Sequence, residues 1–216
     1  MRAVTTQATR ARGARLPRSA RRAQLLGAAQ EVFVSRGYHA AAMDEIADRA
    51  GVSKPVLYQH FPSKLELYLA ILDQHTGELL DGVQAALEST QDNKQRVAAT
   101  IDAYYRFVAR DDAPFRLVFE SDLTNHAGVR ERVDRVELSC AQAIAGVIEE
   151  DTGLSRPEAE LLGMALTGMA QVTARYWISS GGTIPRDAAA ALIAQLSWRG
   201  IRAFPKADGQ ARESSG

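Results

Sequence analysis

Apolar residues recur along this chain at the three- and four-residue spacing of helices, which predicts an all-α protein. The pattern begins near Ser19, where Leu25, Ala29 and Val32 fall on one helical face. No segment alternates apolar and polar residues as a half-buried strand would. The pattern predicts about nine helices, over residues 19–37, 43–50, 54–61, 63–88, 94–110, 114–123, 127–150, 156–179 and 186–203.

Glycine, serine and proline mark the boundaries of the first three of these helices. Gly37 is expected to end the first helix as a left-handed cap, and Gly51 to end the second. Ser53 is expected to begin the third helix as its N-cap. Pro55 falls in the first turn of that helix, where its missing backbone N–H does no harm.

The second and third helices and the turn between them form a helix-turn-helix pattern, IA-x-x-x-GVS over residues 46–53. Ala47 is small where the two helices cross closely, and Gly51 permits the left-handed backbone of the turn. Ile46 and Leu57 are apolar contacts that hold the crossing angle. An ordinary αα-corner also uses glycine and alanine, so this pattern by itself leaves DNA binding open.

The surrounding stretch, MDEIADRAGVSKPVLYQHFPSKLEL over residues 43–67, resembles the DNA-binding domain of the TetR family of bacterial transcriptional regulators. The resemblance covers about residues 18–68. It implies a helix-turn-helix DNA-binding domain over 18–68 and a helical domain for effector binding and dimerisation over 69–204. Residues 1–17 are then a flexible basic arm, and 205–216 a disordered tail.

The chain departs from the family pattern just before the second helix. Members often place serine or threonine there, whereas this chain has Ala40, Ala41 and Ala42. The missing side-chain cap costs about 1 kcal/mol. The departure puts in doubt any phosphate contact at Ala42.

The resemblance and the side-chain chemistry together indicate which residues meet DNA. Lys54, Val56 and Gln59 are candidates for reading base edges, while Tyr58 looks like the family's phosphate-contacting tyrosine. For Tyr58 the alternative is packing on the first helix, and for His60 it is a structural role. The candidate DNA-binding residues are Arg18, Arg21, Arg22, Ser53, Lys54, Val56, Tyr58, Gln59, His60 and Lys64.

Among these, the arginines of the first helix are expected to grip the DNA backbone. Ser53 is expected both to cap its helix and to contact phosphate, and Lys64 to bind the backbone beside the N-terminal amides of its helix. A dimer would read two half-sites of a near-palindromic operator, roughly 34–36 Å apart or a multiple of that distance.

By resemblance, the C-terminal domain forms a homodimer and binds a small molecule. The helices over 156–179 and 186–203 are expected to pair with their copies; the alternative is a monomer core. Small residues, Gly163 and Gly168 among them, permit close helix approach in the first of the two. The candidate ligand-binding residues, each of which could instead be plain core, are His75, Tyr104, Tyr105, Phe107, Phe115, Phe119, Met164 and Met169. Their apolar character favours a largely apolar effector.

Net charge at first argues against a nucleic-acid partner, because Lys and Arg together number 26 and so do Asp and Glu. The charges are segregated, however: residues 1–66 carry eleven positive and five negative side chains, a balance of +6, and residues 67–216 carry −6. A basic first third can neutralise phosphates while the acidic remainder stays off them. A solvated charged tail, or an organellar transit peptide over 1–16, are the alternatives for the arm.

Other classes of protein find little support. There is no P-loop, GxGxxG, GxSxG or HExxH pattern, and we expect no enzyme activity, no cofactor and no metal site. The single cysteine, Cys140, excludes an internal disulfide and fits a reducing compartment. No apolar run is long enough to span a membrane, and a cytoplasmic location is expected. We expect a ligand-released repressor; an activator of the same family and a non-DNA-binding helical adaptor are the alternatives.

Overall fold

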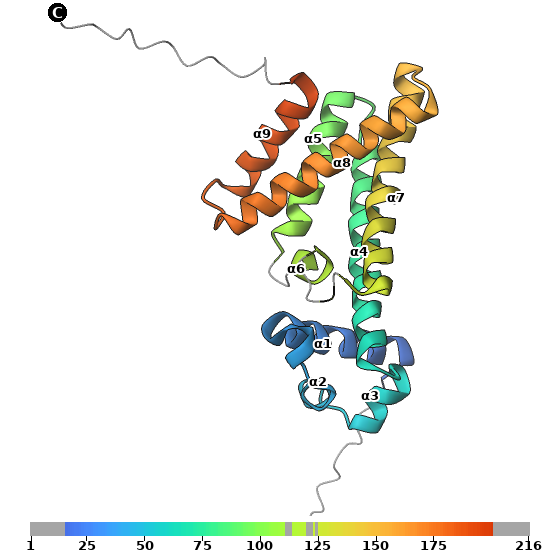
Figure 1. Ribbon diagram of the computed structural model, residues 1–216, viewed down its shortest axis with the longest axis vertical. Coiled ribbons are helices and arrows are strands. Elements are labelled where there is room, and N and C mark those ends of the chain that lie inside the picture. Colours follow the sequence, from blue (N-terminus) through green and yellow to red (C-terminus); the bar gives the residue numbers. More distant parts are fainter. Residues whose placement is uncertain (1–15, 111–113, 120–122, 124, 201–216) are drawn as a thin grey trace, which may run out of the picture.

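The computed structural model describes residues 16–110, 114–119, 123 and 125–200, and those residues form an all-α fold (Figure 1). Arg2, Arg10, Arg12 and Arg15 of the basic arm, and the tail 205–216, lie outside the described residues. Within them the structure has nine helices: α1 (Arg18–Ala40), α2 (Met43–Arg49), α3 (Lys54–His60), α4 (Lys64–Glu88), α5 (Asn93–Val108), α6 (Pro114–Phe119), α7 (Ala127–Thr152), α8 (Arg156–Ser179) and α9 (Arg186–Arg199).

Helix α1 buries the apolar stripe predicted for it, including Leu25, Ala29 and Val32. Gly37 leaves the helical conformation, with φ 75° and ψ 164°, so the regular helix is broken where the sequence predicts its end. Its ψ is not that of a left-handed cap, and a short helical segment continues beyond the break to Ala40.

The turn between α2 and α3 has the geometry that the sequence pattern requires. Gly51 has a φ of 64°, a left-handed conformation that side chains with a Cβ rarely adopt. The N–H of Gly51 donates to the carbonyl of Asp48, and the N–H of Val52 to that of Ala47. Ile46 and Leu57 are completely buried, so the predicted contacts hold the two helices together.

The N-termini of α2 and α3 both lack a side-chain cap. Ala42 precedes α2 without one, as the alanine run predicts. Ser53 occupies the N-cap position of α3, as predicted, but its hydroxyl makes no capping hydrogen bond. The hydroxyl of Ser53 is therefore not committed to the helix.

The long helix α4 joins the DNA-binding helices to the rest of the protein, running upward from α3 in Figure 1. Tyr68 on α4 is buried, and its ring meets that of Phe33 on α1 edge-on, at 5.1 Å between centroids. Its hydroxyl donates to the carbonyl of Leu117 on α6, at 2.8 Å. One apolar core thus continues from α1 through α4 to α6, so α1 can move relative to α6 only by disturbing these contacts.

Helices α7 and α8 pack most closely where α8 has a glycine. A Cβ placed on Gly163 would clash with the backbone carbonyl oxygen of Ala141 on α7. From the sequence, Gly163, Gly168 and nearby alanines were expected to let α8 pack closely against a second copy of the chain. Gly163 instead allows the close packing of α8 on α7 within one chain. Gly168 has open space around it among the described residues and lies on the half-exposed side of α8.

No helix in the described part of the chain is long and apolar enough to cross a membrane.

Candidate DNA interface and effector cavity

The start of α1 and the outer side of α3 line one shallow groove. It brings together five of the ten candidate DNA-binding residues beside Leu16: Arg18, Arg21, Val56, Gln59 and His60. The two arginines supply positive charge, and Gln59 supplies an amide that can both donate and accept hydrogen bonds. This groove has the chemistry needed to meet a phosphate backbone and a base edge together.

Lys54, at the first turn of α3, forms an ion pair with Asp44 on α2, with its Nζ 2.8 Å from the carboxylate. The hydrogen bond and the negative charge of Asp44 raise the pKa of Lys54, so the ammonium stays charged. Contact with DNA would require Lys54 to exchange this partner. Tyr58 on the same helix is 39% exposed, which argues against the alternative that it simply packs on α1.

The side chain of Lys64 turns back onto the protein and does not extend into solvent. Its ammonium donates to the carbonyl groups of Tyr38, His39 and Ala41, at 2.9, 3.3 and 2.9 Å, where α1 ends. It also lies 4.6 Å from the centre of the Tyr38 ring. Positive charge at a helix C-terminus is favourable. This arrangement makes Lys64 a cap that fixes α1 to α4, and the phosphate contact predicted from the sequence would require its ammonium to leave these carbonyl groups.

Arg22 also has a contact within the protein. Its guanidinium lies over the ring of Phe61, 4.4 Å from the ring centre. Phe61 follows α3 and is buried, so this contact fixes the end of α3 against α1.

A cavity of about 140 Å³ lies among α4, α5, α7 and α8. Figure 1 shows that these four helices belong to the part of the protein beyond α1, α2 and α3. That volume is roughly ten times what one water molecule requires. Apolar side chains dominate its wall. The lining residues are Val83, Leu87, Asn93, Arg96, Val97, Thr100, Ile101, Tyr104, Cys140, Ile144, Val147, Ile148, Asp151, Thr152, Leu166, Thr167 and Ala170.

The polar end of the cavity is formed by the beginning of α5 and the end of α7. Arg96 pairs there with Asp151, 2.8 Å away, and also donates to Asn93. Deeper along α5 come Thr100 and Tyr104, on the same helical face. From Asn93 to Tyr104 the wall follows α5 for about 16 Å, so the cavity suits an elongated apolar ligand with a polar end.

Tyr104 is the one member of the predicted ligand set that lines this cavity. Tyr105, Phe107, Phe115 and Phe119 are buried in the core instead. Met164 is 45% exposed, and Met169 accepts a hydrogen bond from Ser197. His75 is fully buried, with its Nδ1 3.0 Å from a carboxylate oxygen of Glu78.

Most of the cavity wall was not predicted from the sequence, because aromatic residues were expected to line it. Large rings fill space in a core, and the space that stays open is bordered by smaller side chains such as Val97, Ile144 and Ala170. The available signal was the run of Val97, Thr100, Ile101 and Tyr104 on one face of α5, but ordinary core has the same spacing.

Cys140 lines the cavity from α7. Burial raises the pKa of its thiol to about 12, so the protonated, unreactive form prevails. The buried thiol adds a weak hydrogen-bond donor to the wall.

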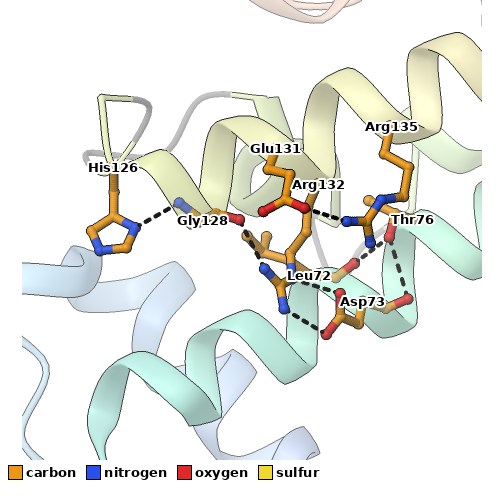
Figure 2. A network of polar contacts seen from close by, with 8 residues as sticks. All are labelled: Leu72, Asp73, Thr76, His126, Gly128, Glu131, Arg132 and Arg135. Carbon is orange, nitrogen blue, oxygen red and sulfur yellow. Dashed lines mark hydrogen bonds and ion pairs between the residues drawn. The ribbon is translucent and has the colours of Figure 1, made fainter.

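A set of polar contacts joins α7, which borders the cavity, to α4, which leads to the DNA-binding helices (Figure 2). Arg132 donates to both carboxylate oxygens of Asp73, at 2.6 and 3.2 Å, and to the carbonyl of Gly128 at 2.9 Å. His126 caps α7 by accepting the N–H of Gly128 at 3.2 Å. These contacts fix the first turns of α7 against the middle of α4.

One face of α8 is apolar and open to solvent in the single chain. Leu161, Val172 and Tyr176 are 72, 64 and 74% exposed, and their spacing places them on one face. Other large apolar side chains exposed on α8 and α9 are Leu162, Met164, Leu192 and Trp198. Apolar stripes of this kind mark interaction surfaces.

A basic helix-turn-helix unit joined by a long helix to a helical domain with an apolar cavity is the architecture of a DNA-binding transcriptional regulator. Residues 25–71 match the family model described as bacterial regulatory proteins, tetR family. The chain belongs to the TetR family.

Relatives cover nearly the whole chain. The chain is 47% identical over 194 residues to the transcriptional activator FasR of Mycolicibacterium smegmatis, covering 90% of this chain and 89% of the relative. A TetR-like regulator from a Rhodococcus species is 30% identical, with a TM-score of 0.67 over 88% of this chain and 100% of that one. FadR of Bacillus subtilis, solved in complex with stearoyl-CoA, is 20% identical and shares the fold, with a TM-score of 0.70 over 83% of this chain and 98% of that one.

Proposed function

We propose that this protein is a transcriptional activator that binds a near-palindromic operator as a homodimer, and that a long-chain acyl thioester lowers its affinity for DNA. The expectation from sequence was repression. The observation that favours activation is the 47% identity, over about nine-tenths of both chains, to a relative named as an activator. Both modes would use the same DNA-binding helices.

The groove between α1 and α3 supports the DNA-binding part of the proposal. It gathers Arg18 and Arg21 beside Gln59 and His60, on a domain whose sequence balance is positive. One such domain offers too small a surface for tight specific binding, so two copies are needed. The exposed face of α8 supplies an apolar surface for that pairing.

The cavity supports the choice of an acyl chain as ligand. Its wall is apolar, follows α5 for about 16 Å, and ends at Arg96, Asn93 and Asp151. An extended hydrocarbon chain of a dozen or so carbons has a comparable length, given bonds of about 1.5 Å. A regulator with the same fold was solved with stearoyl-CoA, which motivates the thioester as the probe.

Transcription in vitro tests the direction of control. The experiment uses purified RNA polymerase, a template that carries the chain's own promoter region, and increasing amounts of the protein. We expect transcript to increase, and stearoyl-CoA to reverse the increase. A decrease in transcript that stearoyl-CoA reverses would establish repression instead.

Binding to that DNA across a salt series tests recognition itself. The logarithm of the affinity should fall steeply with the logarithm of salt concentration, with a sequence-specific excess over random duplex. Affinity that is flat with salt and indifferent to sequence would show that the protein is not an operator-binding regulator.

A Val172→Asp variant tests the dimer. The charge lies in the apolar face of α8, so we expect a monomer in sedimentation and at least tenfold weaker operator binding. Gln84→Asp, exposed on α4, is the matched control and should leave both unchanged. An operator-binding dimer of Val172→Asp would place the interface elsewhere.

A further inference from the structure

We propose that the preferred effector carries a hydrogen-bonding group, a hydroxyl or a ketone, within its hydrocarbon chain, well away from the thioester. This inference rests on the proposed acyl-binding function of the cavity. It concerns which acyl groups the protein distinguishes.

Three buried hydroxyl groups in the wall of the cavity carry the proposal. The side-chain oxygens of Thr100, Tyr104 and Thr167 are buried and have no hydrogen-bond partner among the residues that the structure describes. Tyr104 and Thr167 are only 5 and 7% exposed. All three residues line the same cavity.

Hydroxyls in these positions would ordinarily find partners within the protein. A threonine inside a helix commonly donates to the carbonyl four residues earlier, as Thr76 and Thr173 do in this chain. Thr100 and Thr167 make no such bond within their own, fully described helices. A buried hydroxyl without a partner is unfavourable, and a wall meant only for hydrocarbon would be better served by valine and phenylalanine.

The hydroxyls come from two sides of the cavity. Thr100 and Tyr104 stand four residues apart on one face of α5, and Thr167 comes from α8. Burial raises the pKa of Tyr104, so its hydroxyl keeps its proton and can donate as well as accept. A ligand hydroxyl or carbonyl oxygen between α5 and α8 would satisfy these groups.

Helix geometry gives the position of that group along the ligand. Thr100 and Tyr104 follow Arg96 by about 6 and 12 Å along α5. If the thioester lies at the polar end beside Arg96, the group falls roughly five to ten carbons along an extended chain. This places it in the middle of a long acyl chain.

Competition binding tests the proposal with matched ligands on the full-length protein. The ligands are stearoyl-CoA, isomers of hydroxystearoyl-CoA substituted roughly five to ten carbons from the thioester, free stearate and free CoA. We expect at least one hydroxylated isomer to bind on the order of tenfold more tightly than stearoyl-CoA, the gain of one or two buried hydrogen bonds. Free stearate shows whether the thioester is needed.

Tyr104→Phe and Thr100→Val keep the shape of the wall nearly unchanged, because the first replaces a hydroxyl with hydrogen and the second replaces a hydroxyl with a methyl group. We expect these variants to bind stearoyl-CoA at least as tightly as the wild type, and to lose the preference for the hydroxylated isomer. Thermal unfolding and operator binding confirm that each variant is folded.

Two failures are distinguishable. In the first, stearoyl-CoA binds but no hydroxylated isomer is preferred, or the preference survives in both variants. That result would overturn the proposal of a polar group within the acyl chain and leave the acyl-binding function standing. If neither acyl thioester binds to protein that still binds its operator, the acyl-binding function fails, and this inference fails with it.

Discussion

At the scale of single residues, the DNA-binding domain divides its cations between two tasks. Arg18 and Arg21 face the groove beside α3, where phosphate can reach them. Lys64 is committed to three carbonyl groups at the end of α1. The two kinds of residue should respond differently to neutralisation.

Lys64→Met tests this division. The variant keeps an apolar stem but loses the hydrogen bonds to α1, so we expect the free energy of unfolding to fall by about 1–2 kcal/mol. The salt dependence of operator binding should keep its slope. Arg18→Met is the matched comparison: it should leave stability nearly unchanged and flatten the slope by about one. A flattened slope for Lys64→Met, with stability intact, would restore Lys64 as a phosphate contact.

Gly163 is the residue at which backbone packing leaves no room for a side chain. Gly163→Ala would force α8 away from the Ala141 carbonyl of α7, and we expect a loss of about 1–3 kcal/mol of stability, as in other overpacked cores. Gly146→Ala on α7 has open space around its Cβ and should instead stabilise the helix by about 0.5–1 kcal/mol. Thermal unfolding measures both; similar effects of the two changes would contradict the close approach.

At the scale of elements, α4 and α7 connect the cavity to the DNA-binding helices. Val83 and Leu87 at the end of α4 line the cavity, and Lys64 begins the same helix beside α3. Arg132 and Asp73 fix α7 to the middle of α4 (Figure 2). A ligand that displaces α7 can therefore act on the spacing of the DNA-binding helices.

Arg132→Gln tests the coupling between these helices. Because the pair with Asp73 is partly exposed, stability should change by no more than about 1 kcal/mol. We expect the factor by which the effector weakens DNA binding to fall about fivefold or more, with the affinities for each ligand alone nearly unchanged. Arg135→Gln, which removes a pair with Glu131 inside α7, is the control. Equal coupling in wild type and Arg132→Gln would exclude this route.

The positions of the helices could be predicted from the sequence more accurately than the roles of individual side chains. Helix spacing, Gly51 and Pro55 are local signals, and they placed the helices close to where the structure has them. The cavity depends on which helices meet and how completely their side chains fill the space between them, and no local pattern records that. For the same reason the capping role of Lys64, made with carbonyls more than 20 residues away, was not evident in its position at a helix start.

At the scale of the whole molecule, charge and shape act together. The positive balance of residues 1–66 and the negative balance of the remainder orient the protein with its helix-turn-helix domain toward DNA. The cavity is lined by Val83 and Leu87 at the end of α4 that lies away from α3. An effector bound there, as proposed, would meet the protein away from the duplex, and its control of DNA binding would have to act through the helices.

The most direct test of this account is the fluorescence anisotropy of a labelled operator duplex, bound by the protein and titrated with stearoyl-CoA. We expect the anisotropy to fall to that of free DNA, with no response to free CoA. Ile144→Trp places a large side chain in the cavity. This variant should bind the operator as the wild type does and lose the response to stearoyl-CoA. Unchanged anisotropy with the wild type, or an equal response from Ile144→Trp, would contradict the claim that this cavity controls DNA binding.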